Sequence, residues 1–473
     1  MRFACSLLII IAMTSAVSAQ ANPPPAGITA SWNGGSGNWE DPSRWTGLSS
    51  GYPTGDDYRV SIASGDSHIA TDVAVTTVFA TGGASLHIDP GGSLMLNRVP
   101  HALSVGGDLT INGGDVTVDG TLTSNGVVTL SSGTLSGSGT IQSGFYGTHL
   151  EWSGGRISGS GSVNLKGSAS SSSIAIPASS QVYFGERAIT LSFGSSFDWN
   201  GGTFLSTGGG SIDFNFFSRL KLNASGTFAQ PESVDAAPIQ ISLTSGSIIK
   251  NSPGTTRIAN AQISTQGQSY VEVRQGKLLL DRAPVGTMQT LDVDGELEAP
   301  SLKAVRISGS GTVRGLAVSA QQLFPGGESV GQLTIDGNFE TYSAGSLAAS
   351  AWLDFDVLGP AANQHDHVDV SGEFSFGTTA IVPLGTPTTT LTMHFGNYIP
   401  QAGDTFELVH FSSLKTFLAP TLHYTGVGEG FLYSITTTDH AMVFTAVNDA
   451  HPVPEPTTIG LCLVAWPLLR RRR

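Results

Sequence analysis

The sequence has little cysteine, little charge and no long helical period, and each shortage excludes a class of structure. Its two cysteines, Cys5 and Cys462, lie close to the two chain ends, so the body of the 473-residue chain contains no disulfide. Charged residues make up 12%, against roughly 25% in typical soluble domains. No long stretch between residues 58 and 324 has a 3.6-residue apolar period, which excludes helical crossovers.

Positive charge is especially scarce. There are 22 basic and 36 acidic residues, and five of the basic residues are Arg2 and the four terminal arginines, which leaves 17 for the rest of the chain. No basic stripe interrupts this acidic background, so the composition excludes nucleic acid as a partner. Divalent cations or neutral glycans are the partners that it favours.

Glycine and short apolar runs are abundant. The chain has 60 glycines, and between residues 58 and 323 runs of alternating apolar residues are separated by Gly, Ser, Asn and Asp, as at 109–111, 116–118 and 127–130. This pattern predicts strands of a few residues with tight turns, in which glycine supplies the positive φ of the corners.

Internal repeats indicate how such strands are buried. Residues 151–157 are echoed by 198–204, 47 positions later, and residues 135–141 recur at 157–163, 22 positions later, and at 307–313. A coil of about 22 or 23 residues fits both intervals, and such coils are stable only when neighbours cover them. The sequence therefore predicts an all-β parallel solenoid over residues 58–323. An array of β-sandwiches is the alternative, with longer strands and less regular spacing.

The acidic-Trp-x-Gly-Gly and Gly-Ser-Gly-Thr patterns of these repeats resemble autotransporter passenger and related parallel β-helix proteins, which implies a right-handed coil. From residue 324 to 448 the alternating strands become longer, and Val368-Asp369-Val370-Ser371-Gly372 resembles a strand common in the C-terminal part of autotransporter-like repeat proteins. We expect this C-terminal β-rich module to be either more solenoid or a small β-sandwich.

Residues 22–57 form a tryptophan-rich N-terminal segment. Trp32, Trp39 and Trp45 could cap the open first coil or form a platform on which glycans stack. We favour the cap, because the end of a solenoid must be covered. Trp152 and Trp199, which fall at equivalent places in the repeat, are expected to pack inside the coil.

The first 21 residues have the features of a secretory signal peptide. Arg2 precedes an apolar run at 7–13, and small residues follow, with cleavage expected after Ala19 or Ala21. The three prolines at 23–25 then prevent a helix from continuing. The chain is therefore expected to be exported.

Residues 449–473 have the order of a sorting tail. A Pro-Glu-Pro motif precedes an apolar stretch at 459–469, and clustered arginine after such a stretch halts translocation. This order resembles the PEP-CTERM family, which implies an exosortase-type processing enzyme as partner and cleavage near the motif. The stretch is short for a span and contains Pro467, so the short apolar helix would insert into the inner membrane only transiently. The motif comprises Val453, Pro454, Glu455 and Pro456, and the basic cluster comprises Arg470, Arg471, Arg472 and Arg473.

Candidates for chemistry in the body are few. Calcium is the one cofactor considered, because outward carboxylates on neighbouring turns can gather it; a solvated outer face is the interpretation we favour. The calcium candidates are Asp354, Asp356, Asp366 and Asp369, with His365 and His367 beside them. For catalysis only Glu186 with Arg187, and Asp213, stand out, and none is assigned a catalytic role.

The sequence thus favours an exported structural or adhesive protein of the cell surface or extracellular matrix, and not an enzyme. The alternative is a carbohydrate-binding protein, or a polysaccharide lyase or glycoside hydrolase, built on the same scaffold.

Overall fold

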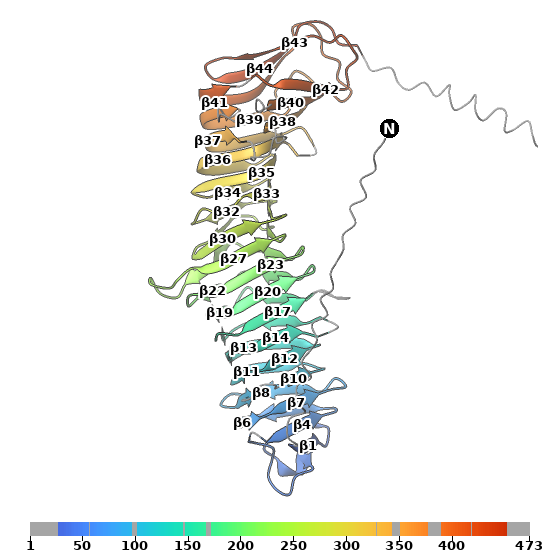
Figure 1. Ribbon diagram of the computed structural model, residues 1–473, viewed down its shortest axis with the longest axis vertical. Coiled ribbons are helices and arrows are strands. Elements are labelled where there is room, and N and C mark those ends of the chain that lie inside the picture. Colours follow the sequence, from blue (N-terminus) through green and yellow to red (C-terminus); the bar gives the residue numbers. More distant parts are fainter. Residues whose placement is uncertain are drawn as a thin grey trace, which may run out of the picture.

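The computed structural model is an elongated stack of β-strands, with β1 at one end and β43 and β44 at the other (Figure 1). It describes residues 27–55, 57–96, 102–144, 147–166, 172–327, 329–342, 351–376, 389–417 and 419–451. Within these ranges the regular elements are strands and one 3-10 turn, η1 (Pro42–Arg44), and the strands of successive coils pair in parallel. The predicted all-β class is confirmed, and the long parallel sheets are consistent with the predicted solenoid.

Each coil contributes strands to two or three long sheets. The first sheet contains β1 (Ile28–Trp32), β3 (Trp45–Thr46), β4 (Tyr58–Ile62), β7 (Thr77–Ala80), β10 (Ala102–Val105), β12 (Thr121–Ser124), β14 (Thr140–Ser143), β17 (Ser162–Lys166), β20 (Ala188–Ser192), β23 (Ser211–Asn215), β27 (Ile239–Thr244) and β30 (Ala261–Gln266).

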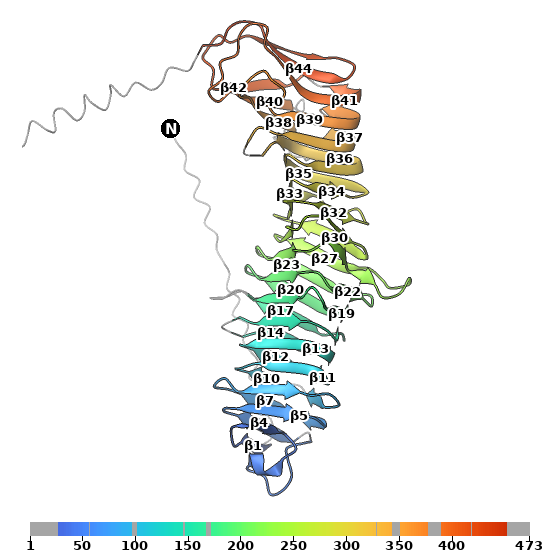
Figure 2. The ribbon, with the colours of Figure 1, turned by 180° about the vertical axis from the view of Figure 1, so that it is seen from behind.

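The second sheet runs the whole length of the stack, and Figure 2 shows its later strands in order beneath β42. It contains β2 (Ser36–Asn38), β5 (Asp66–Ile69), β8 (Ser85–Ile88), the first parts of β11 (Leu109–Val118) and β13 (Val127–Ser136), β15 (His149–Trp152), β18 (Ser173–Ile176), β21 (Ser196–Trp199), β24 (Arg219–Leu222), β28 (Ser247–Lys250), β31 (Tyr270–Val273), β33 (Met288–Val293), β35 (Ser301–Gly309), the second part of β36 (Thr312–Pro325), β38 (Ala351–Asp356), β40 (Thr389–His394) and β42 (Thr421–Thr425).

The third sheet completes the coils. It contains β6 (Asp72–Val75), β9 (Ser93–Leu96), the last parts of β11 and β13, β16 (Arg156–Ile157), β19 (Gln181–Phe184), β22 (Thr203–Ser206), β25 (Gly226–Phe228), β26 (Gln230–Pro231), β29 (Thr255–Ile258), β32 (Lys277–Leu280), β34 (Glu296–Glu298), the first part of β36, β37 (Gln332–Thr341), β39 (His367–Phe376) and β41 (Thr405–Phe417). The last strands, β43 (Tyr433–Thr437) and β44 (Ala441–Ala446), pair antiparallel with each other, and β44 pairs antiparallel with β41.

Strand register explains the sequence repeats. Leu135 pairs directly with Ile157, so the 22-residue echo is one coil. Glu151 pairs with Ala175 and Ala175 pairs with Asp198, so the 47-residue echo is two coils. The predicted coil interval is confirmed in this part of the chain.

Coil length nevertheless changes along the stack. Ala102 pairs with Thr121, a coil of 19 residues, whereas Ser211 pairs with Gln240, a coil of 29. The first sheet ends at β30, and beyond it the coil shortens to 16 residues, the interval between paired Ser301 and Ala317.

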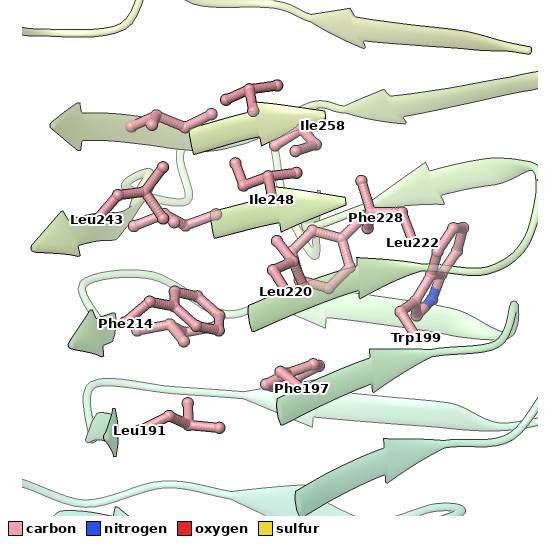
Figure 3. Packing of buried hydrophobic residues seen from close by; sticks show 14 of the residues in the cluster. Leu191, Phe197, Trp199, Phe214, Leu220, Leu222, Phe228, Leu243, Ile248 and Ile258 are labelled. Carbon is pink, nitrogen blue, oxygen red and sulfur yellow. The ribbon is translucent and has the colours of Figure 1, made fainter. Parts of the chain in front are cut away.

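The core is a continuous apolar column inside the coils (Figure 3). Alternate residues of each strand point inward, as in β18, where Ile174 and Ile176 are buried. Burying each such side chain contributes about 1.5–3 kcal/mol, and the coils above and below provide the cover. Around β21 and β22 the column becomes aromatic, with Trp152, Trp199 and Phe204 in edge-on or stacked contacts with neighbouring rings.

Both ends of the column are covered. Trp39 is fully buried and packs edge-on against Trp45, which packs edge-on against Trp32. The three indoles therefore cap the first coil, as favoured above, and their faces are not available to stack on a ligand. At the other end the parallel pairing continues through β42, which supports more solenoid instead of a separate sandwich, and the β43–β44 hairpin closes the stack.

Candidate ligand-binding faces

The four candidate calcium ligands do not form one site in the described part of the chain. Asp354 accepts a hydrogen bond or ion pair from His394 at 2.8 Å, whereas Asp369 pairs with His410 at 2.9 Å on the neighbouring sheet. Asp366 is buried and is held by backbone N–H groups. Among the described residues, no group of three or more histidine, cysteine or acidic side chains could hold a metal.

Asp366 is instead a buried carboxyl group with an unusual acidity. Its two oxygens accept hydrogen bonds from the backbone N–H groups of Gly331 and Asp356, each at 2.8 Å. Burial raises the pKa of Asp366 to about 7, which outweighs the lowering effect of these two donors, and the nearby charges of Asp356 and Asp354 raise it further.

This burial predicts that the protein loses stability as the pH rises from about 4 to about 7. The folded-state pKa of Asp366 lies above the unfolded value, so the folded state binds the extra proton, and its stabilisation is lost as that proton leaves. Between pH 5 and pH 8 we expect the free energy of unfolding to fall by roughly 2 kcal/mol from this residue. Urea unfolding at several pH values measures it.

Asp366→Asn should remove that pH-dependent part, although its amide would also meet a backbone donor at every pH. The slope with pH is therefore the diagnostic quantity. Asp439→Asn, at an exposed position, changes the charge equally and should keep the wild-type slope. An unchanged slope in Asp366→Asn contradicts the assignment.

Of the catalytic candidates, Arg187 is a buried structural residue. Its guanidinium donates to the carbonyl oxygens of Ser158 at 2.9 Å and Gly137 at 2.6 Å, so it joins the corners of successive coils. Burial lowers the pKa of Arg187 to about 10. Its neighbour Glu186 is exposed and makes no hydrogen bond or ion pair within the described residues. Asp213 lies on β23, where burial raises its pKa, and the structure does not pair it with Glu186.

The largest outer hollow, with a volume of about 940 Å³, lies on the third sheet over β32, β34, β36 and β37. A ladder of ion pairs lines it: Lys277 contacts Glu296 at 2.8 Å and also Glu298, and Arg314 contacts Glu296 at 2.6 Å and also Asp336. Burial would raise the pKa of Glu296, but the hydrogen bonds from Lys277 and Arg314 outweigh it and the pKa is lowered. The basic groups of this ion-pair ladder are thus already neutralised.

A second hollow, of about 680 Å³, lies on the second sheet and has a different chemistry. The outward column that crosses it runs through paired residues of successive coils, in the order Arg219, Ser247, Tyr270, Thr290, Arg306, Gln322 and Trp352. We call this column the arginine–aromatic strip. Arginine and aromatic residues alternate at every second coil, and small or amide side chains lie between them.

The arginines of the strip lack acidic partners. Neither Arg219 nor Arg306 forms an ion pair within the described residues, and Nε of Arg306 has no hydrogen-bond acceptor. The guanidinium of Arg306 lies over the ring of Phe324, 4.0 Å from its centroid, which fixes its plane. Tyr270 and Trp352 are 38% and 36% exposed, which is high for such large rings.

Strained aromatic residues border the same hollow. Phe193, Phe216 and Phe217 have φ values of +56°, +48° and +66°, and all three side chains are more than half exposed. The rings of Phe193 and Phe216 stack 5.0 Å apart, and Phe217 lines the hollow beside Arg219. Left-handed backbone costs a non-glycine residue about 1–2 kcal/mol, and burial of these rings does not offset it.

The sorting motif at 453–456, the arginines at 470–473 and the signal peptide lie outside the described residues. Within the described part of the chain, no helix has the length and apolar character needed to span a bilayer. Neither the protein-family models nor the curated proteins include a match to this chain.

Proposed function

We propose that this protein is an exported structural or adhesive rod of the cell surface or extracellular matrix, sorted through its PEP-CTERM-like tail. The observation that best supports a structural role is the uninterrupted stack of parallel coils, closed at one end by the indole cap and at the other by the β43–β44 hairpin. Capped ends favour a rod of fixed length over end-to-end polymerisation.

The finer features of the proposal come from the sequence. We expect the coil to be right-handed, because parallel strands joined through crossovers are right-handed in nearly all proteins. Export is supported by residues 1–21, and transient attachment to the inner membrane is supported by the motif, apolar stretch and arginines of residues 449–473.

Processing of the tail is testable in a bacterium that contains an exosortase. The surface-associated protein should have an intact mass that lacks both the signal peptide and the residues after the Pro-Glu-Pro motif. Pro454→Ala combined with Pro456→Ala should leave the tail attached and move most of the protein to the membrane fraction. Thr458→Ala, just beyond the motif, is the matched control and should be processed normally. An intact tail on wild-type surface protein would overturn the sorting proposal.

Carbohydrate binding is the second candidate function, and the arginine–aromatic strip favours it. An enzymatic form of this function has less support in the ion-pair ladder. A general acid for glycoside hydrolysis needs a raised pKa, whereas that of Glu296 is lowered by Lys277 and Arg314.

A further inference from the structure

The arginine–aromatic strip points to a ligand, because packing does not explain its composition. Its outward positions contribute little to the core, and a partly exposed tyrosine and tryptophan lose little water by staying there. Two arginines without acidic partners are notable in a chain of net charge −14, where carboxylates outnumber basic groups. The second hollow has three arginines, Arg219, Arg274 and Arg306, and two carboxylates, and one of these, Glu272, is bound to Arg274 at 2.6 Å.

The spacing of the strip is regular in space although it is irregular in sequence. Adjacent strands of a sheet lie about 4.8 Å apart, so an arginine or an aromatic ring recurs about every 10 Å over a length of about 29 Å from Arg219 to Trp352. Ser247, Thr290 and Gln322 fill the intervening coils with hydroxyl and amide groups. A ligand that matches this surface is long and straight, and it repeats a negative group.

The chemistry of the side chains narrows the ligand further. Guanidinium groups bind carboxylates through two parallel N–H···O hydrogen bonds, and the stacked plane of Arg306 is held ready for such contacts. Exposed aromatic rings pack against the apolar C–H faces of sugars, and hydroxyl and amide groups bind sugar hydroxyls. The geometry points to an extended acidic polysaccharide, a chain of uronic-acid type, as the ligand of the arginine–aromatic strip.

The bordering phenylalanines fit this assignment. Phe217 extends the aromatic surface beside Arg219, and its left-handed backbone is the type of strain that is retained at binding sites. Replacing it by glycine removes the strain together with the ring. Phe217→Gly should therefore raise the thermal midpoint of the protein while weakening the binding of the saccharide.

The site gives a meaning to the adhesive role and rests on the proposed function only in that sense. Purified full chain is titrated calorimetrically with a hexasaccharide of galacturonic acid and with the same hexasaccharide fully methyl-esterified. The acid should bind at least tenfold more tightly than the ester, and higher salt should weaken it. Arg219→Gln with Arg306→Gln should lower the affinity for the acid at least tenfold and remove the preference over the ester. Tyr270→Ala should weaken the binding of both.

The matched control removes two arginines elsewhere. Arg59 on β4 of the first sheet and Arg282 after β32 also form no ion pair within the described residues, so Arg59→Gln with Arg282→Gln makes the same change in net charge. This control should bind like the wild type. The proposal is overturned if the acid does not bind, if the control loses as much affinity as the strip variant, or if a single-stranded DNA oligonucleotide of equal charge binds equally well. Processing of the tail is measured by mass, so a failure here is separable from a failure of sorting.

Discussion

Gly133→Ala is expected to lower the free energy of unfolding by about 2–5 kcal/mol, since it combines backbone strain with a clash between coils. Gly133 has φ of +84°, and a Cβ atom there would lie 1.9 Å from the carbonyl oxygen of Gly114 in the neighbouring coil. The backbone of one coil would have to move away from the other, which weakens the parallel pairing of β11 with β13. Urea unfolding followed by circular dichroism gives the change.

Gly194→Ala separates the two contributions. Gly194 has a similar φ of +79°, but nothing lies within 4 Å of the position that its Cβ atom would take. This control should cost only the left-handed backbone, about 1–2 kcal/mol. Equal losses in the two variants would mean that contact between coils is not what requires glycine at residue 133.

Predictability from the sequence depended on whether a feature repeats at a fixed interval. The Gly-Ser-Gly corners at Gly137 and Gly159 recur one coil apart, and both have positive φ, as predicted from their sequence. Trp152 and Trp199 are two coils apart and are buried, as expected of packing residues. In this region the coil length is nearly constant, so similarity in sequence reports adjacency in space.

The arginine–aromatic strip could not be found in this way. Its paired members fall at residues 219, 247, 270, 290 and 306, so successive intervals are 28, 23, 20 and 16 residues. Coil length falls because the first sheet ends at β30 and the corners differ in size. Without the register, Arg219 and Arg306 are two of several scattered basic residues.

The same limit applies to single candidates. Arg187 was considered for catalysis because it follows Glu186, but sequence neighbours on a corner can point in opposite directions. Its guanidinium turns inward to carbonyl groups that earlier coils contribute, 29 and 50 residues back in the sequence. A charged residue at a glycine-rich corner is therefore consistent with a structural role, and only the stacking order of the coils reveals which role it has.

The aromatic part of the core leads to the second large effect. Phe204→Ala should cost about 3–5 kcal/mol, as for other buried phenylalanines replaced by alanine. Phe204 is fully buried, stacks on Phe228 at 4.8 Å and meets Trp152 edge-on at 5.8 Å. Three neighbouring coils supply these rings, so the cavity would open between coils, and their flat sheets limit how far they can collapse into it.

Phe216→Ala is the matched control, because it deletes the same ring from a side chain that is 56% exposed. We expect its free energy of unfolding to stay within about 0.5 kcal/mol of the wild type. Thermal and urea unfolding of both variants distinguish the two positions. If both variants lost the same stability, the aromatic column would not be the part of the core that holds successive coils together, and the exposed phenylalanines would have a packing role that removes the strongest reason to place them at a binding site.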